Sequence, residues 1–174
     1  MAETHWSFRD ATQSDLPEIV AIYNQTIAGR MVTADLEPVS VTQRQVWFDS
    51  HKPQRHPIWV AERAGRIVGW LSFSAFHSRA AYDASAELSI YIDTAERGHG
   101  LGSTLLQRAI EHAPTLGLYN LIGLIFGHNT PSLALFERYG FARWGTLPDV
   151  AVLDGIERTL VIVGKRIQKV TSCS

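Results

Sequence analysis

The chain has 174 residues, 45% of them apolar, and this length and composition predict a single domain with a sizeable core. Its 16 basic and 17 acidic residues give a formal net charge of −1, which argues against a surface for nucleic acid or an anionic membrane. The longest apolar run is too short to span a bilayer, and the first residues lack the layout of a signal peptide. Because Cys173 is the only cysteine, an internal disulfide is excluded, and we expect a cytoplasmic protein.

Two helices are predicted near the start of the chain. The first covers residues 10–29, where Thr12 and Asp15 have the spacing of a capping box. The apolar residues that fall on one face of this helix are Leu16, Ile19, Val20, Tyr23 and Ile27. The second helix covers residues 39–51, and we expect Val46 to face the core together with the tryptophan that follows it.

Three strands are predicted next. Residues 57–62 and 67–76 have the composition of strands, and the short stretch 63–66 joins them as a tight hairpin. A third strand, residues 84–93, carries Glu87 among apolar and small residues. The tryptophans that we expect to pack in the core are Trp47, Trp59 and Trp70.

The rest of the chain alternates between helix and strand. A glycine-rich turn leads into a helix, and the apolar residues on one face of that helix are Leu101, Leu105, Ala109 and Ile110. The apolar run 120–127 predicts a strand buried on both faces, and residues 130–140 predict a short helix that ends on a glycine. Residues 143–167 predict two strands around a turn at Asp154–Gly155.

This order of elements predicts an α+β fold. We expect one mixed, mostly antiparallel central sheet of about six to seven strands, flanked by helices. No internal repeat, low-complexity tract or linker divides the chain, so we predict a single domain, residues 1–174. Its core is expected within residues 7–167, and residues 168–174 are expected to form a short C-terminal tail.

Gly98, Gly100 and Gly102 stand at the mouth of a predicted helix, although glycine is unfavourable inside helices. One reason for glycines there is a backbone that approaches an anion closely, with its N–H groups pointing inward at a helix N-terminus. A glycine-rich turn without a ligand is the alternative. The spacing does not match the dinucleotide pattern G-x-G-x-x-G, and no lysine stands before Ser103 as a P-loop requires.

The arrangement Arg97-x-x-Gly100-x-Gly102 between a strand and a helix resembles the pyrophosphate-binding signature of the GNAT N-acetyltransferases. Residues 89–92 resemble the strand that pairs with the pantetheine arm in that family, and residues 128–141 resemble the second half of its site. The resemblance implies the GNAT fold, with the sheet splayed at an acetyl-CoA site and acetyl-CoA as the acetyl donor. The cofactor-binding residues that it implies are Ile90, Tyr91, Ile92, Arg97, Gly98, His99, Gly100, Leu101, Gly102, Ser103, Asn129 and Ser132.

A narrower resemblance, to the phosphinothricin N-acetyltransferases, covers residues 8–163. Its most diagnostic part is Arg79-x-x-Tyr82 followed by Ala86-Glu87. That subfamily acetylates the amino group of small amino-acid analogues; its arginine and tyrosine hold the acidic part of the substrate, and its glutamate is the general base. The substrate-binding residues implied here are Phe76, His77, Arg79, Tyr82 and Glu87.

Glu87 also stands out on physical grounds. An unpaired carboxylate within an apolar strand is costly, and burial is expected to raise its pKa toward neutrality. The implied reaction is direct transfer, in which Glu87 takes a proton from the substrate ammonium and a backbone N–H near Ile90 or Tyr91 polarises the thioester carbonyl. Arg79 is expected to hold a substrate carboxylate, and Tyr82 to add a hydrogen bond.

Two positions depart from the pattern of the subfamily. Phe136 stands where a tyrosine or histidine commonly supplies a general acid, and since phenylalanine cannot donate a proton, water would take that role. Tyr139 lies further along the same predicted helix. Ala34 stands where an aromatic residue usually lines the substrate pocket, and this leaves room for a bulkier acceptor than phosphinothricin.

Two other functions remain open. One is an N-acetyltransferase for a protein or peptide, and the other is a non-catalytic module that binds acetyl-CoA. The histidines show no metal-ligand spacing, so we expect no metal cofactor. By analogy with the family we expect a homodimer with a small-molecule amine substrate and with no nucleic-acid or membrane partner.

Overall fold

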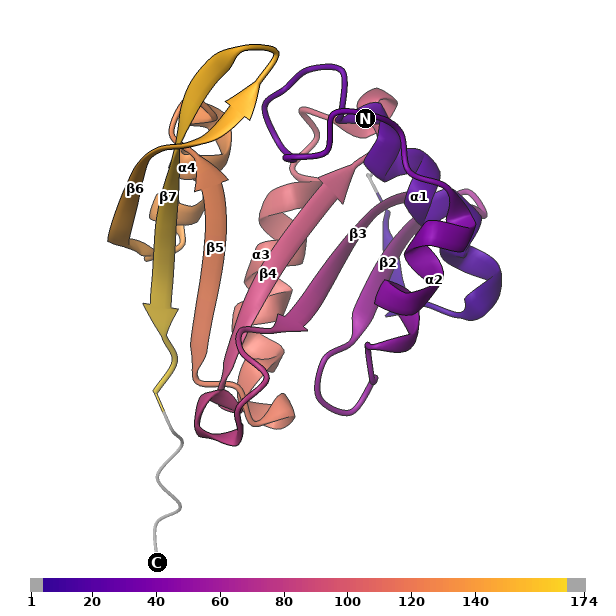
Figure 1. Cartoon of the computed structure of the whole chain (residues 1–174). Coiled ribbons are helices and arrows are strands. Elements are labelled where there is room, and N and C mark those ends of the chain that lie inside the picture. Colours follow the sequence, from indigo (N-terminus) through magenta and orange to yellow (C-terminus); the bar gives the residue numbers. More distant parts are fainter. Residues whose placement is uncertain (1–4, 169–174) are drawn as a thin grey trace, which may run out of the picture.

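The computed structural model describes residues 5–168, which form one mixed sheet of seven strands with helices packed on its faces (Figure 1). Neighbouring strands follow the order β1-β2-β3-β4-β5-β7-β6. The strands are β1 (Ser7–Asp10), β2 (Ile58–Arg63), β3 (Arg66–Ala75), β4 (Ser85–Ile92), β5 (Asn120–Phe126), β6 (Ala142–Leu153) and β7 (Ile156–Arg166). The α-helices are α1 (Leu16–Gln25), α2 (Val41–Asp49), α3 (Leu101–His112) and α4 (Thr130–Arg138).

The predicted α+β fold around one mixed, mostly antiparallel sheet is confirmed, and both predicted hairpins are present. Ala64 and Gly65 connect β2 to β3, and Asp154 and Gly155 connect β6 to β7, with φ angles between 50° and 77°. Such pairs of left-handed residues form the type I′ turn, whose twist matches that of the two strands it joins.

The first helix begins later than the sequence predicts, because a short 3-10 turn at Gln13–Asp15 precedes α1. The predicted capping box is present, since the Thr12 amide donates to the Asp15 carboxylate over 2.7 Å. The predicted apolar face of this helix is buried against the sheet.

Three details differ from the sequence-based expectations. Val46 is 78% exposed, because Trp47 takes the inward position of α2 and packs edge-on against Trp70 with ring centroids 5.4 Å apart. Strand β5 is not buried on both faces throughout, since Leu124 is 40% exposed beyond the point where β5 leaves its neighbour β4. The short edge strand β1, which pairs with β2, is mostly exposed and has no apolar alternation that would predict it.

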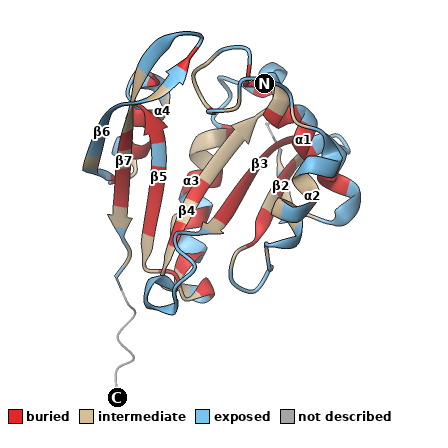
Figure 2. Cartoon of the chain, in the orientation of Figure 1, coloured by how far each residue is buried: buried red, intermediate tan, exposed pale blue. Residues whose placement is uncertain are grey.

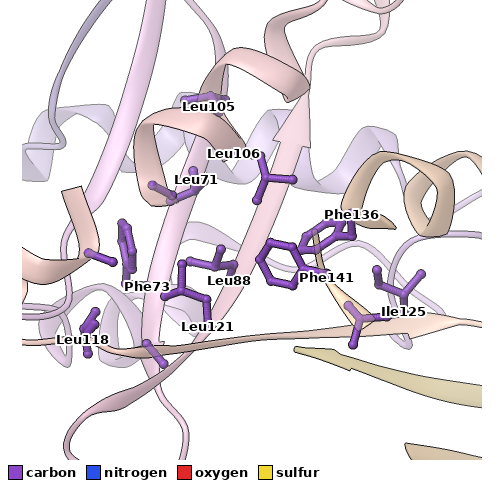
Figure 3. Packing of buried hydrophobic residues seen from close by; sticks show 14 of the residues in the cluster. Leu71, Phe73, Leu88, Leu105, Leu106, Leu118, Leu121, Ile125, Phe136 and Phe141 are labelled. Carbon is purple, nitrogen blue, oxygen red and sulfur yellow. The ribbon is translucent and has the colours of Figure 1, made fainter. Parts of the chain in front are cut away.

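Two apolar clusters hold the sheet between the helices. The cluster on the α3 and α4 side includes Leu88, Leu105, Leu121, Phe136 and Phe141 (Figure 3). The cluster on the α1 and α2 side includes Ile19, Tyr23, Val60, Ile67 and Trp70. Figure 2 shows the buried positions gathered in the central strands, whereas β6 is largely exposed.

The sheet opens at β4. This strand pairs with β3 over its whole length, but it pairs with β5, in parallel, only from Ser85 to Glu87. From Leu88 onward the two strands diverge, so that edge of β4 has no neighbouring strand (Figure 1). Backbone N–H and C=O groups at such an edge require another partner. The expected splay is therefore present.

Candidate active site

A cleft of about 490 Å³ lies where β4 and β5 diverge. The end of β4, the turn after it and the starts of α3 and α4 form its walls. The predicted cofactor residues that line it are Ile90, Tyr91, Ile92, Arg97, Gly98, Gly100, Leu101, Gly102, Ser103, Asn129 and Ser132. His99 does not line the cleft, because its Nδ1 faces the Glu96 carbonyl and donates to it over 3.0 Å. The fold thus brings all of the predicted cofactor residues except His99 to one place.

Gly98 and Gly100 shape the turn between β4 and α3. Their φ angles are 81° and 88°, in the left-handed region that residues with a Cβ rarely adopt. A Cβ at either position would meet no atom within 4 Å, so the backbone conformation, not crowding, requires glycine here. Gly100 is the N-cap of α3, and no side chain caps that helix. Its first N–H groups are therefore open to the cleft, where they favour an anion.

Asn129 begins the opposite wall of the cleft. This residue is 6% exposed, and its Oδ1 accepts a hydrogen bond from the Ser132 amide over 3.3 Å, which caps α4. The nitrogen of the Asn129 amide makes no hydrogen bond within the described part of the chain. It remains free to donate to a ligand in the cleft.

A second cavity, of about 160 Å³, continues the cleft between β4 and β5. It shares Tyr91 and Asn129 with the cleft, and Phe136 is among the residues that line it. Phe136 is 5% exposed and packs edge-on against Phe141 with ring centroids 4.9 Å apart (Figure 3). Tyr139 lines neither cavity.

Glu87 is the last β4 residue that pairs with β5; it lies opposite Ile122 on that strand and opposite Ser74 on β3. Its side chain is half-buried, and this burial raises the pKa of the carboxyl group above its ordinary value. Residues 5–168 supply neither a hydrogen bond nor an ion pair to it. A carboxylate with a raised pKa and no fixed partner, at the point where the sheet opens, suits a proton acceptor.

The other predicted substrate residues lie on the connection between β3 and β4. Phe76, His77, Arg79 and Tyr82 are all exposed there. The Phe76 and His77 rings lie 5.9 Å and 4.8 Å from the Tyr82 ring, so three aromatic rings gather on this loop. Neither these four residues nor Glu87 lines the two cavities at the splay. The loop leads directly into β4, but the structure does not assemble it with Glu87 into one cavity.

The sequence of residues 17–141 matches the profile of the Acetyltransferase (GNAT) family, over more than half of the chain. The chain belongs to the GNAT acetyltransferase family. This membership agrees with the splay of the sheet and with the position of the glycine turn between β4 and α3. It confirms the expected fold and places the protein among the acetyltransferases.

Several relatives of this GNAT protein carry the names of acetyltransferases for amino-acid analogues. A *Bacillus subtilis* protein that carries the name of a phosphinothricin acetyltransferase is 51% identical over 162 residues, covering 92% of this chain and 99% of that protein. An L-methionine sulfoximine/L-methionine sulfone acetyltransferase of *Pseudomonas aeruginosa* is 37% identical over 83% of this chain and 84% of its own. The solved structure of a GNAT phosphinothricin acetyltransferase from *Sinorhizobium meliloti*, in complex with AcCoA, is 27% identical with a TM-score of 0.88, covering 97% of this chain and 92% of that one. The expected resemblance to the phosphinothricin N-acetyltransferases is confirmed.

Part of the GNAT cleft carries no sequence signal. Thr26, Met31 and Val32 line it from the end of α1 and the loop that follows, a stretch without a glycine pattern or a charged motif. Glu96 also lines the cleft, although its side chain is 2% exposed. The fold alone brings the loop after α1 to the splay, so no local pattern could have predicted its contribution.

Within residues 5–168 of this GNAT protein, no group of three or more His, Cys, Asp or Glu side chains is placed to hold a metal ion. In the same range, each helix is too short or too polar to cross a membrane. The predicted C-terminal tail lies outside the described residues from residue 169 onward, and Cys173 lies there with it.

Proposed function

We propose that the protein is an acetyl-CoA-dependent N-acetyltransferase for the α-amino group of a small amino-acid-like substrate of the phosphinothricin or methionine sulfoximine type. The observation that carries the proposal is the half-buried Glu87, whose pKa is raised, at the point where β4 and β5 separate. The names of the relatives, which include acetyltransferases for methionine sulfoximine, support the substrate class.

The cleft suits acetyl-CoA as the donor. The N–H groups of Gly100, Leu101 and Gly102 would hold a pyrophosphate at the start of α3, and the exposed Arg97 adds positive charge beside them. The open edge of β4 beyond Glu87 would pair with the pantetheine arm, as a sheet edge pairs with an added strand. The complex of the *Sinorhizobium meliloti* relative with AcCoA supports this use of the cleft.

Glu87 would take a proton from the substrate ammonium, directly or through one water, and leave the amine lone pair free to attack the thioester carbonyl. A backbone N–H of Ile90 or Tyr91 would donate to the carbonyl oxygen as negative charge develops on it. The new bond joins the amine nitrogen to the acetyl carbon as the bond from that carbon to sulfur breaks. Because a thiol has a pKa of about 8.5, water suffices to protonate the leaving group where Phe136 offers no proton.

Arg79 and Tyr82 would recognise the carboxylate of the substrate. The Arg79 guanidinium is exposed and makes no ion pair within residues 5–168, so it is available to an anionic ligand. A charge-assisted hydrogen bond contributes about 1.5–3 kcal/mol, which corresponds to a preference of about 10- to 100-fold for acceptors with a free α-carboxylate. Ala34 is exposed in the loop after α1, and its small side chain leaves room for a bulkier acceptor.

A homodimer in the cytoplasm, without nucleic-acid or membrane partners, is part of the same proposal. The net charge of −1 and the single cysteine support the location and the absence of such partners. Figure 2 shows that β6 is largely exposed. The large apolar residues exposed along β6 and at the start of β7 are Trp144, Leu147, Val150, Val152 and Ile156. An exposed edge of this kind is an aggregation hazard unless it is covered, and a second copy of the chain would cover it.

A thiol-release assay with acetyl-CoA tests the proposal. Phosphinothricin, methionine sulfoximine, free amino acids, their amides, polyamines and short peptides serve as acceptors. We expect acceptors with a carboxylate to exceed their amides by about 10- to 100-fold in kcat/KM, and Arg79→Ala to remove this preference by weakening the carboxylate substrates alone. Glu87→Gln should retain acetyl-CoA binding in calorimetry while turnover at pH 7 falls about 100-fold or more.

The same assay separates the alternatives. Peptides that turn over faster than every free amino acid would indicate a protein or peptide N-acetyltransferase. Binding of acetyl-CoA without thiol release for any acceptor would indicate a non-catalytic module. Full turnover by the Glu87→Gln variant at pH 7 would show that another group takes the proton.

A further inference from the structure

Ser74 on β3 is the residue directly opposite Glu87 in the antiparallel pairing of β3 with β4. Side chains of directly opposed residues lie on the same face of a sheet, with Cβ atoms about 4.5–5.5 Å apart. Both side chains are half-buried, on the face that α1 and α2 cover. The fold therefore sets the Ser74 hydroxyl beside the proposed base.

His51, which follows α2, bonds to the Ser74 hydroxyl. Its Nδ1 lies 2.6 Å from the Trp47 carbonyl oxygen, and its Nε2 lies 3.1 Å from Ser74 Oγ. A carbonyl oxygen only accepts, so Nδ1 carries a hydrogen, and the neutral ring then has a lone pair at Nε2. Burial lowers the pKa of His51 and thus favours the neutral ring.

This order of donors decides where the Ser74 hydrogen points. An Nε2 atom without a hydrogen can only accept, so Ser74 donates its single hydrogen to His51. The Ser74 oxygen then has only lone pairs to offer Glu87, and the two groups do not hydrogen-bond in the structure. A lone pair accepts from a neutral carboxyl group but gives nothing to a carboxylate, so it favours proton uptake by Glu87.

We propose that His51 is a positioning residue for the reaction, because it holds the Ser74 hydrogen away from Glu87 and so makes Glu87 a stronger proton acceptor. The inference rests on the proposed role of Glu87 as the base. When Glu87 takes the proton of the substrate ammonium, the new carboxyl O–H donates to Ser74 Oγ. The donor chain then runs in one direction, from Glu87 through Ser74 and His51 to the Trp47 carbonyl.

Few charged groups act on this chain of donors. Burial is the largest cause of the lowered pKa of His51. The charges of His56, on the turn that follows α2, and of Arg44, on α2, lower this pKa further. At the Glu87 end of the donor chain, burial alone raises the pKa of Glu87. The charge of Glu87 in turn helps to raise the pKa of Tyr91, which lies further along β4. Within residues 5–168, no cation therefore offsets the burial of the Glu87 carboxylate.

Carbon-13 NMR titration of the Glu87 carboxyl group tests the inference without depending on turnover, and Glu87→Gln identifies the signal. His51→Asn keeps an N–H near the Nδ1 position for the Trp47 carbonyl but removes the acceptor at Nε2. Ser74 can then donate its hydrogen to the carboxylate. We expect both the pKa of Glu87 and the acidic limb of the kcat/KM profile to fall by about one pH unit.

Further variants isolate the hydroxyl as the link. In a Ser74→Ala background, His51→Asn should leave the pKa of Glu87 unchanged, because the group through which His51 acts is absent. His51→Gln, whose amide oxygen reaches the Nε2 position and accepts, should keep the wild-type value. His56→Asn is the matched control, a nearby histidine outside the donor chain, and it should not move the acidic limb.

The outcomes are distinct. An unchanged pKa of Glu87 in His51→Asn, or an equal fall with and without the Ser74 hydroxyl, would overturn the inference. If the Glu87 signal titrates as expected while Glu87→Gln retains full turnover, the effect of His51 on Glu87 stands and the proposed base is wrong.

Discussion

Gly98, Gly100 and Gly102 occur together in the sequence, but the fold requires them for different reasons. The first two have positive φ angles, whereas Gly102 lies within α3 and has an ordinary helical conformation. A Cβ at Gly102 would lie 3.5 Å from Leu135 Cδ2, which is an ordinary van der Waals contact. The free protein therefore needs glycine at the first two positions. At Gly102 the structure imposes no such requirement, and the close approach of the proposed acetyl-CoA ligand would account for a glycine there.

We predict that Gly100→Ala lowers the free energy of unfolding by about 1–2 kcal/mol, because a residue with a Cβ is strained at this φ angle. Gly102→Ala, the matched control two residues further on inside α3, should keep or raise stability, since alanine is favoured inside a helix. Gly100→Val should also weaken acetyl-CoA binding at least about tenfold, or about 1.4 kcal/mol, in calorimetry. Equal stability of the two alanine variants in urea denaturation would contradict this account.

Glu96, whose side chain is 2% exposed, anchors the turn after β4. Trp6 Nε1 donates to one carboxylate oxygen over 2.9 Å, and an Arg63 nitrogen lies 2.8 Å from the other. Gln25, at the end of α1, accepts a hydrogen bond from the Thr94 amide over 2.9 Å. Because Trp6 precedes β1 and Arg63 ends β2, one buried carboxylate ties the edge of the sheet to the glycine turn.

Glu96→Ala should lower the free energy of unfolding by about 2–3 kcal/mol, because it leaves the Trp6 N–H and the Arg63 guanidinium without their acceptor. Acetyl-CoA binding should weaken as well, since the glycine turn loses its anchor. Glu62→Ala is the matched control: Glu62 pairs with Arg9 over 2.8 Å at an exposed site, and such a pair contributes at most about 1 kcal/mol. Chemical denaturation compares the two variants, and equal losses would show that Glu96 anchors nothing.

The elements that the sequence predicts well are those set by neighbouring residues. The apolar face of α1, the turns Ala64–Gly65 and Asp154–Gly155 of the two hairpins and the glycine that follows α4 are all local patterns. By contrast, β1 is too short and too exposed to show a pattern. The inward face of α2 depends on where this helix docks, so local periodicity cannot distinguish Val46 from Trp47.

The same distinction applies to the site. Gly98, Gly100 and Asn129 could be predicted because each lies next to a strand and a helix that the sequence also predicts. Met31 reaches the cleft only through the path of the loop after α1. Ser74 meets Glu87 only through the register of β3 on β4, and a register shift of one residue would turn it to the other face of the sheet.

The splay divides the sheet into one half with β1–β4 and another with β5–β7. The halves join where β4 and β5 begin, and Arg30, in the loop after α1, joins them again at the open end. Its guanidinium lies 2.8 Å and 3.3 Å from the Asp154 carboxylate in the β6–β7 turn, and its carbonyl accepts a hydrogen bond from His128 Nε2 over 2.8 Å. Figure 1 shows this loop beside the tip of the β6–β7 hairpin. Arg30 therefore links the hairpin to a wall of the cleft.

We predict that Arg30→Ala weakens acetyl-CoA binding by about two- to fivefold, because Met31 and Val32, which follow it and line the cleft, must then be ordered by the ligand. Asp154→Ala should have the same effect, and the double variant no larger one, since both remove a single bridge. High salt should reduce the difference from the wild type, because the ion pair is exposed and screened.

Arg55→Ala, which removes an exposed arginine beside Asp83 near the β3–β4 connection, is the control and should leave the affinity unchanged. Calorimetry at low and high salt measures these affinities, and additive losses in the double variant would show that the loop and the hairpin act separately on the cleft.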